Sequence, residues 1–551
     1  MSGKENGMVL LCKNGILFIV SLLIFLCNCE KPPLLKNNTV ELKPLENLGI
    51  QSTSINEDSY QHILYVSKLR GLDKEGAGTK AQPHKSISYT LSQIKDASDR
   101  NRYAVLVSEG YYREDPIHML PHVDLFGGYA QDSWERDIFS HLTELNGKGK
   151  NRILIGADSS HLDGFFIVDG QVRGKGAGLL CDGTSPLITN NIFYHNKTLG
   201  PDPWNPKYWH EIANDGGALY CVNGAAPSIQ NNLFIDNKTE NGRGAAIACQ
   251  TRCQPKISHN VFAYNITGLK DPMRSSDGGA LSVFHWCSPT IENNLFIENK
   301  ALSSNDGGAI FIALWSSANV RNNILLDNHA GDDAGGIFVG GQEHRYNAPL
   351  DTLPSADQFY VNIEKNIFQG NQNSSKNSGA MRFTMESRGR FAENLVVHNS
   401  GIYFQRSEVL VEKNIILDNF LFIETKEGLK PGIIRDNIIW ADFSLHTPAS
   451  VINNNIKGKF LPNGNYSQTP QFEDDIVELS VLAASFSRLH CTTELLLNKP
   501  DVSEGKLVNR IVKAGNKWGV VKTNKNNLLQ VWGDVSGELK LLILPTYSLK
   551  N

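Results

Sequence analysis

A nine-residue phrase that recurs along the chain restricts its fold more than any other feature. At Ile291–Asn299 the phrase reads Ile-Glu-Asn-Asn-Leu-Phe-Ile-Glu-Asn, and similar copies start 18 to 43 residues apart. The copies are Ile188–Asn196, Ile229–Asn237, Ile257–Asn265, Ile291–Asn299, Val320–Asn328, Ile363–Asn371, Phe391–Asn399 and Val411–Asn419, with weaker copies at Ile434–Asp442 and from Ile452. A segment this short cannot bury its own apolar side, so neighbouring copies must stack and bury it together.

Two positions of the phrase keep the same residue type in most copies. The fourth residue is asparagine: Asn191, Asn232, Asn260, Asn294, Asn323, Asn366, Asn394, Asn414 and Asn437. The sixth is often phenylalanine: Phe193, Phe234, Phe262, Phe296 and Phe368. Stacked copies therefore predict a hydrogen-bonded ladder of asparagine side chains and an inward stack of rings. We also expect each of these asparagines to form a left-handed bend, which asparagine tolerates well.

A second phrase precedes many copies, which means that each coil holds at least two strands. It is a pair of small residues and an apolar run, at Gly216–Cys221, Gly244–Cys249, Gly278–Val283 and Gly307–Ile312, and more loosely at Gly176–Cys181 and Gly335–Val339. Both phrases are short, rich in β-branched and aromatic residues, and cut by Asn and Gly, which favours strands over helices. The chain therefore predicts an all-β solenoid, a parallel β-helix of about ten coils.

These phrases resemble those of the right-handed parallel β-helix repeat proteins, the pectate-lyase-like superfamily. Upstream, Ile63–Ser67, Gly71–Asp73 and Ala104–Glu114 are similar to the N-terminal cap and first coil of that superfamily. The resemblance covers roughly residues 60 to 490. It implies the fold specifically and says little about activity, because functional sites are grafted onto folds.

The charge of the chain argues against a nucleic-acid partner. It has 53 Lys and Arg against 57 Asp and Glu, a net charge of −4, so there is no basic excess for a phosphate backbone. We expect a monomer.

The first 29 residues are typical of a bacterial export signal. Lys4 and Lys13 precede the apolar run Ile16–Leu26, which is too short to span a bilayer comfortably. Leu26–Cys29 resembles a loose lipoprotein box in which Cys29 is acylated, although Asn28 is atypical before the cysteine. We expect an envelope lipoprotein or a secreted protein; the remaining alternative is an uncleaved anchor.

The rest of the chain divides by composition and spacing. Ser86 is placed to cap a helix over Ile87–Ile94, which closes the open end of the stack. The expected parts are a flexible tether at 30–59, the N-terminal cap and first coil at 60–110, the β-helix at 111–465, and a closing coil with a small β module at 466–551.

Aromatic residues on an insertion and along one strand row suggest a sugar-binding face. Trp204, Tyr208 and Trp209 lie on a long insertion, where flat apolar rings suit pyranose stacking. Alternatively, this loop folds down over the flank of a coil. The floor of a sugar-binding groove would be an outward row of side chains, with Trp286 near its edge. This row is Tyr220, Ala248, Ser282, Phe311 and Phe338.

Three acids precede the glycine phrases. Asp277 and Asp306 fall on adjacent coils, so their carboxylates can lie within about 5 Å. Such a pair, with Asp215 on the same column, would repel, raise one pKa, or hold a cation such as calcium. The alternative is that each Asp caps the tight turn before glycine.

Histidine and arginine beside the same strands are the catalytic candidates. A base such as His285 with a partner such as Arg243 is what β-elimination of a uronic acid needs. The alternative places them as surface or turn residues, and no lyase signature transfers residue by residue.

The cysteines Cys181, Cys221 and Cys249 predict an inward apolar column. The alternative is that these cysteines form disulfides, and that Cys253 also pairs with Cys287.

The function we expect is an exported β-helix protein that binds a polysaccharide or cell-surface glycan. Cleavage of that glycan, by a lyase or a hydrolase mechanism, is left open. The alternative from another class is a non-catalytic surface adhesin or structural spacer.

Overall fold

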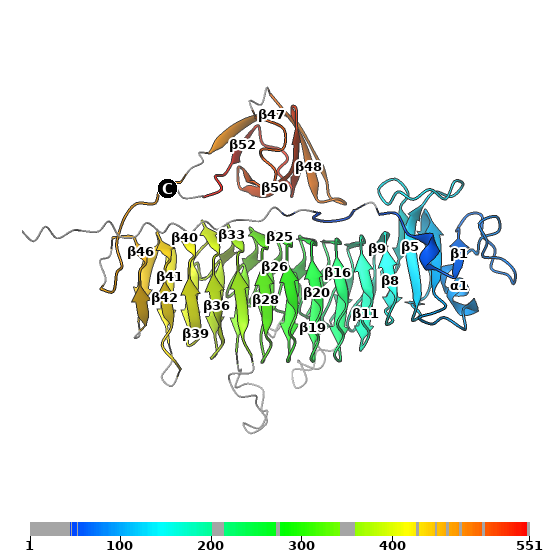
Figure 1. Ribbon diagram of the computed structural model, residues 1–551, viewed down its shortest axis with the longest axis horizontal. Coiled ribbons are helices and arrows are strands. Elements are labelled where there is room, and N and C mark those ends of the chain that lie inside the picture. Colours follow the sequence, from blue (N-terminus) through cyan, green and yellow to red (C-terminus); the bar gives the residue numbers. More distant parts are fainter. Residues whose placement is uncertain are drawn as a thin grey trace, which may run out of the picture. The chain divides into compact units, whose positions relative to one another are not determined.

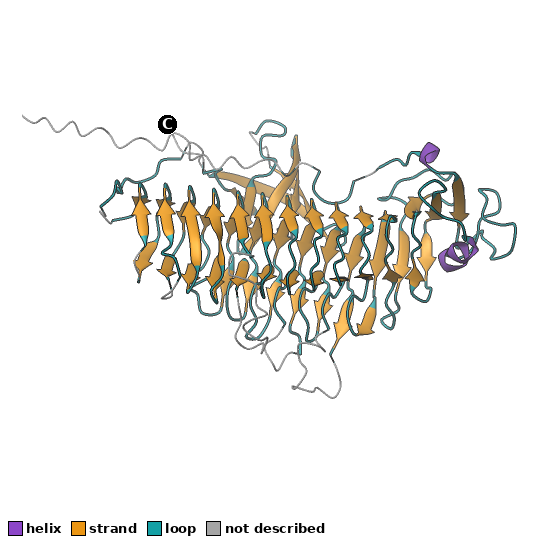
Figure 2. Ribbon diagram, turned by 60° about the horizontal axis from the view of Figure 1, so that its bottom comes forward, coloured by secondary structure: helices purple, strands orange, loops and turns teal. Residues whose placement is uncertain are grey.

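The computed structural model describes residues 45, 47–51, 53–200, 214–270, 276–341, 359–425, 429–446, 449–458, 462–472, 476–498 and 502–547. The expected export signal with Cys29, and the loop residues Trp204, Tyr208 and Trp209, lie outside these ranges. Nearly all described elements are strands (Figure 2). Within the described ranges, no helix has the length and apolar character that a membrane crossing requires.

Four parallel sheets run along a solenoid, so the predicted parallel β-helix is confirmed (Figure 1). Each full coil contributes one strand to each of three long sheets, and seven coils add a short strand to a fourth. Strands of neighbouring coils pair in parallel and in register, so that equivalent residues of successive coils form columns.

Sheet 1 has 14 strands and carries the start of the repeated phrase. Its strands are β1 (His62–Val66), β2 (Tyr103–Ser108), β5 (Val123–Tyr129), β8 (His161–Asp163), β12 (Leu187–Thr189), β16 (Ser228–Gln230), β20 (Lys256–Ser258), β24 (Thr290–Glu292), β28 (Ala318–Arg321), β32 (Val361–Glu364), β36 (Arg388–Ala392), β39 (Glu408–Glu412), β42 (Ile433–Arg435) and β45 (Ser450–Ile452).

Sheet 2 has 13 strands and carries the end of the phrase. Its strands are β3 (Gly110–Tyr112), β6 (Thr143–Asn146), β9 (Phe165–Val168), β13 (Ile192–Tyr194), β17 (Leu233–Ile235), β21 (Val261–Ala263), β25 (Leu295–Ile297), β29 (Ile324–Leu326), β33 (Ile367–Gln369), β37 (Leu395–Val397), β40 (Ile415–Leu417), β43 (Ile438–Ile439) and β46 (Asn455–Ile456).

Sheet 3 has 12 strands and carries the glycine-led phrase, and sheet 4 has seven short strands. Sheet 3 holds β4 (Ile117–His118), β7 (Leu154–Ile155), β11 (Leu179–Asp182), β15 (Leu219–Val222), β19 (Ile247–Gln250), β23 (Leu281–Phe284), β27 (Ile310–Ile312), β31 (Ile337–Gly340), β35 (Met381–Thr384), β38 (Ile402–Gln405), β41 (Phe420–Glu424) and β44 (Asp442–Leu445). Sheet 4 holds β10 (Gln171–Arg173), β14 (Lys197–Leu199), β18 (Lys238–Thr239), β22 (Ile266–Thr267), β26 (Lys300–Ala301), β30 (His329–Ala330) and β34 (Gln372–Asn373).

The asparagine ladder predicted between sheets 1 and 2 is confirmed. Both the backbone N–H and Nδ2 of Asn294 donate to Oδ1 of Asn323 on the next coil, at 2.9 and 3.0 Å. Its Nδ2 also donates to the carbonyl of Ile257 at 2.9 Å, and its Oδ1 accepts two bonds from Asn260. A second ladder of the same form runs through Asn196, Asn237, Asn265, Asn299, Asn328, Asn371 and Asn399 at the end of the phrase. Every polar atom of such a buried amide is thereby satisfied.

The left-handed bend lies one residue earlier than we predicted. Asn293 has φ of 56°, and the corresponding residues His259, Asn322 and Lys365 also have positive φ, whereas the ladder asparagines do not. The reason is that the ladder asparagine must turn its amide inward along the stack. The residue before it makes the turn and projects outward, so its identity varies.

The core is filled by columns of like side chains. The rings of Phe193, Phe234, Phe262 and Phe296 stack face to face with centroids 4.7 to 5.0 Å apart. Leu325 follows in that column and separates Phe296 from Phe368, so the predicted stack is continuous over four coils. The inward column of Cys181, Cys221 and Cys249 is also present, with all three buried as free thiols.

The N-terminal cap contains the predicted helix, α1 (Ile87–Gln93), where Ser86 Oγ accepts the N–H of Tyr89 at 3.4 Å. A 3₁₀ turn, η1 (Glu57–Ser59), precedes β1. The described part of the expected tether is not a free linker. Leu48 and Ile50 are 6% and 8% exposed, and Gly49 N–H donates to the carbonyl of His259 at 2.9 Å.

Six antiparallel strands near the C-terminus close into a small barrel, which confirms the predicted β extension. They are β47 (Val477–Ser487), β48 (Thr492–Leu497), β49 (Ile511–Ala514), β50 (Lys517–Lys525), β51 (Leu528–Trp532) and β52 (Lys540–Ile543), in the order β47-β48-β51-β50-β49-β52. The barrel begins at Val477, within the range where we expected a closing coil followed by a small β module.

Replacement of one ladder residue should destabilise the solenoid strongly. Asn294→Ala leaves the N–H and Nδ2 of Asn260 without their acceptor, and each such buried group costs about 1–3 kcal/mol. We expect a loss of at least about 3 kcal/mol in urea unfolding. The neighbouring Asn293→Gly, which keeps the left-handed turn, should stay within about 1 kcal/mol of the unmodified protein. Equal stability of the two variants would contradict the ladder's role.

Candidate functional site

The outer face of sheet 3 brings together most residues singled out from the sequence. Its register forms one outward row through Tyr220, Ala248, Ser282, Phe311, Phe338, Arg382, Tyr403, Phe422 and Ser444. The first five residues form a row as predicted, but none is more than 6% exposed. From Arg382 onward the row is half-exposed, so its accessible part lies on β35, β38 and β41.

Stacked aromatic rings form the accessible part of this face. The rings of Tyr403 and Phe422 are 4.2 Å apart and only 5° from parallel. The ring of His446 lies 4.7 Å beyond Phe422, and Phe420 lies 6.1 Å away. Side chains from β38, β41 and the end of β44 thus form one flat apolar surface, of the kind that carbohydrate rings stack on.

Arg382 connects the aromatic surface with a group of acids. Its guanidinium lies 5.0 Å from the ring centre of Tyr403, and its Nη2 donates to Oε1 of Gln405 at 2.9 Å. Its Nη1 forms an ion pair with Oδ1 of Asp333. The guanidinium is therefore held in a fixed orientation between rings and carboxylates.

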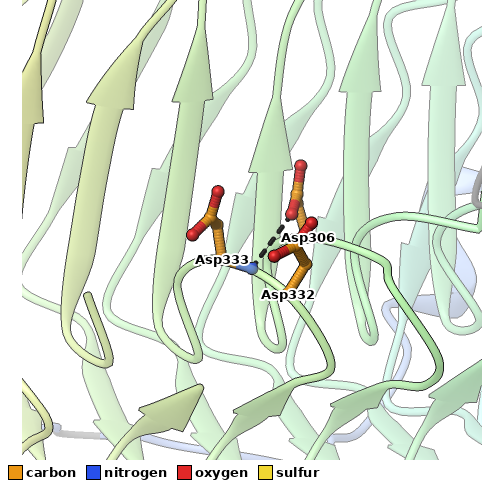
Figure 3. A group of neighbouring side chains, drawn as sticks. All are labelled: Asp306, Asp332 and Asp333. Carbon is orange, nitrogen blue, oxygen red and sulfur yellow. Dashed lines mark hydrogen bonds between the residues drawn. The ribbon is translucent and has the colours of Figure 1, made fainter. Parts of the chain in front are cut away.

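Three carboxylates lie close together at this end of the face (Figure 3). Oxygens of Asp306, Asp332 and Asp333 lie within 4.8 Å of one another. Oδ1 of Asp306 accepts the backbone N–H of Asp333 at 3.0 Å. Burial, and then the charges of Asp277, Asp333 and Asp332, raise the pKa of Asp306 well above its ordinary value. This agrees with the predicted effect of stacked acids, and it lets Asp306 keep its proton at higher pH than a free carboxyl group does.

Asp215 and Asp277 link neighbouring coils, because each accepts a backbone N–H of the next coil and not one of its own turn. Oδ1 of Asp215 accepts the N–H of Arg243 at 2.8 Å, and Oδ1 of Asp277 accepts that of Asp306 at 3.0 Å. Asp306 can offer an oxygen to a cation together with Asp332 and Asp333, but the ion pair of Asp333 with Arg382 opposes a second positive charge. Calcium at Asp215, Asp277 and Asp306 stays a prediction.

The two catalytic candidates both lie close to the ring of Phe284. The guanidinium of Arg243 is 4.2 Å from the ring centre of Phe284, and the ring of His285 is 4.3 Å from the same centre. Arg243 is only 1% exposed and pairs with Asp215 at 3.5 Å, which favours a structural role. Nδ1 of His285 accepts from Gln250 at 3.3 Å. The catalytic roles of Arg243 and His285 stay predictions.

The remaining candidates fall into two groups. Tyr220 is buried and donates to Oε1 of Gln250 at 2.5 Å, so it takes part in a closed network. Trp286 is 37% exposed and lies 5.4 Å from Trp315.

Four residues of the site did not stand out in the sequence: Asp332, Asp333, Arg382 and Tyr403. The glycine phrase is altered around Asp333 and is absent before Tyr403, so the repeat pattern did not mark them.

Comparisons with known proteins agree with the fold. The family model described as "Right handed beta helix region" matches residues 166–325, and the chain is a right-handed parallel β-helix protein. Two crystal structures of a GH136 lacto-N-biosidase from Eubacterium ramulus, the selenomethionine derivative and the native protein, are similar at 11% and 12% identity. Each alignment covers 71% of this chain, with 67% and 68% of the other chain and TM-scores of 0.35 and 0.29. Likeness at this level carries no argument about activity. No curated protein matches the chain.

The raised pKa of Asp306 predicts how stability depends on pH. An acid whose pKa is higher in the folded state than in the unfolded state costs stability as pH rises from the unfolded-state pKa to the folded-state pKa. Asp306→Asn keeps the oxygen that accepts from Asp333 and removes the charge. We expect a higher melting temperature than that of the unmodified protein at pH 8, and a smaller difference at pH 4. A variant that is less stable at pH 8 would contradict this account of the acid group.

Proposed function

We propose that the protein binds a neutral saccharide chain on the outer face of sheet 3. The observation that carries the proposal is the half-exposed, nearly parallel ring pair of Tyr403 and Phe422, in register with Arg382. Successive coils place these groups along one row, so adjacent sugar units can meet a flat ring, a guanidinium and carboxylates in turn.

Charge is the reason for proposing a neutral ligand. The positive charge of Arg382 is matched by Asp333, while Asp306 and Asp332 lie beside them. A uronic acid polymer would bring further negative charge to this group and would be repelled. The carboxylate oxygens instead suit sugar hydroxyls, which donate hydrogen bonds. The proposal therefore disfavours the lyase mechanism.

We also propose that the protein lies outside the cytoplasm, because its first 29 residues predict export.

Hydrolysis of the bound glycan is the second candidate, and the acid group favours it. Glycoside hydrolysis commonly uses one protonated and one ionised carboxyl group, and retaining enzymes hold the two about 5 Å apart. Asp306, with its raised pKa, would protonate the leaving oxygen. Asp332 would act as the partner, because Asp333 is engaged by Arg382.

Binding is tested by removing a stacking ring. With a panel of neutral oligosaccharides in isothermal calorimetry, we expect Tyr403→Ala to bind at least about tenfold more weakly, a loss of about 1.4 kcal/mol. Tyr111→Ala removes a 39% exposed tyrosine on β3 and should bind as the unmodified protein does. Binding that survives Tyr403→Ala, or preference for uronic acid polymers, would refute the proposal. No binding to the whole panel would favour the adhesin, with a protein partner.

Hydrolysis is tested by release of reducing ends from any oligosaccharide that binds. Asp306→Asn removes the proposed acid, so we expect the rate to fall at least about 100-fold while binding persists. Asp132→Asn changes an acid whose side chain is 95% exposed, far along the chain from the acid group, and should leave the rate unchanged. No reducing ends from the unmodified protein would leave binding as the function, and full activity of Asp306→Asn would refute Asp306 as the acid. Products that absorb in the ultraviolet would instead identify a lyase.

A further inference from the structure

A second cleft lies on the first coils, on sheet 1 and away from the row on sheet 3. Its volume is about 500 Å³, which falls in the range of small-molecule sites. One wall comes from β5, β8 and β12, with Phe126, His161 and Thr189. The other wall is the leading segment, defined as residues 47–51 and 53–60, which precedes β1.

The leading segment is hydrogen-bonded to the solenoid at three points. Gln51 N–H donates to Oδ1 of Asn190 at 2.9 Å. Arg136 Nη1 donates to the carbonyl of Thr53 at 2.6 Å, and the Tyr60 hydroxyl donates to Asp124 at 2.7 Å. The two walls are therefore joined by directed bonds, and the cleft is formed before any ligand arrives.

The charges at the cleft are matched among themselves. Asp163 is 2% exposed and accepts from Asn190 Nδ2 at 2.6 Å, and also from Thr189 and from Arg136. Close by, Arg102 donates to both oxygens of Asp124, at 2.9 and 3.0 Å. Two guanidiniums thus meet two carboxylates. Since these charges are engaged, the cleft favours neither an anion nor a cation.

The hydrogen bonds around His161 leave its Nδ1 as an acceptor for a ligand. The single hydroxyl proton of Thr189 goes to Asp163, so Thr189 Oγ1 must accept from Nε2–H of His161, 2.6 Å away. Burial lowers the pKa of His161, so the ring is neutral and its Nδ1 is an unprotonated acceptor. No residue in the described ranges donates to that Nδ1.

The leading segment offers a second acceptor. Nε2 of Gln51 donates to the carbonyl of Gly49 at 3.2 Å and to that of Leu48 at 3.4 Å. Its Oε1 therefore remains an acceptor on the wall of the cleft opposite His161. Phe126 is 3% exposed and is covered by the rings of Tyr60 and His161, which pack against it edge-on, so it supports the cleft from below.

We infer that this cleft is a binding site for a neutral polyhydroxylated ligand, a sugar unit whose hydroxyls donate to His161 Nδ1 and Gln51 Oε1. The site does not depend on the saccharide row of sheet 3. A protein with both sites would hold a glycan at two separate places along the solenoid.

The test uses the full chain carrying Tyr403→Ala, so that the row on sheet 3 is weakened. Saturation-transfer NMR with glucose, galactose, N-acetylglucosamine and their β-linked disaccharides should show binding of at least one of them. Glucuronic acid, the charged probe, should bind at least about tenfold more weakly than the best neutral sugar.

Two further substitutions in this background locate the ligand. Gln51→Met and His161→Phe each remove one acceptor while keeping similar bulk, and each should weaken sugar binding at least about tenfold. Asp58→Ala, an exposed residue on η1 outside the cleft lining, should have no effect. Gln51→Met keeps the test valid if His161→Phe fails to fold.

Three results would overturn the inference: no neutral sugar bound by the Tyr403→Ala protein, unchanged binding by the folded acceptor variants, or equal binding of glucuronic acid. Affinity that is the same with and without Tyr403→Ala, but lost with Gln51→Met, would instead remove the proposal for sheet 3 and support this one.

Discussion

The hydrogen bonds between stacked asparagine side chains set the geometry on which the rest of the molecule depends. A buried primary amide has two donors and an acceptor to satisfy, and each one left unpaired costs about 1–3 kcal/mol. An asparagine directly above, another directly below and one backbone carbonyl satisfy all of them, as Asn260, Asn323 and the carbonyl of Ile257 do for Asn294. A shift of one residue in any coil would break bonds on both sides of it. The ladders therefore fix the register of coil on coil, whatever the length of the loops between them.

Fixed register turns residues that are distant in sequence into neighbours. Asp333, Arg382 and Tyr403 belong to different coils, yet they meet on one face because each holds a defined place relative to its own ladder asparagine. The same rule produces the phenylalanine stack and the cysteine column in the core. A solenoid of this kind can carry a long ligand, since each coil adds one more contact in a straight row.

Much of the fold could be predicted because the repeat itself is the structural signal. The asparagine ladder, the ring stack, the inward cysteines and the cap at Ser86 all follow from residue type and spacing. The left-handed turns were placed one residue late, since the residue that makes the turn projects outward and changes from Asn293 to His259 to Lys365. The polar composition of residues 30–59, with Pro32 and Pro33, predicts a tether, but Leu48 and Ile50 in this range are apolar and bury against the solenoid.

The sites were harder to predict than the fold. Reasoning from the glycine phrase pointed to the outward row from Tyr220 to Phe338, which the structure buries. The accessible rings Tyr403 and Phe422 follow coils in which that phrase has already lost its glycine pair, so no pattern drew attention to them. The acidic group was found in part, through Asp306, because stacking brings its charge against its neighbours. The cleft under the leading segment joins residues more than 100 positions apart, and only the structure brings these together.

The central claim is that register assembles a saccharide row from successive coils. A crystal structure with a bound neutral oligosaccharide tests it most directly. The account predicts sugar rings stacked on Tyr403 and Phe422, with hydroxyls in hydrogen-bond reach of Asp306 or Asp332. A saccharide bound elsewhere with the outer face of sheet 3 empty, or asparagines out of register from coil to coil, would contradict it.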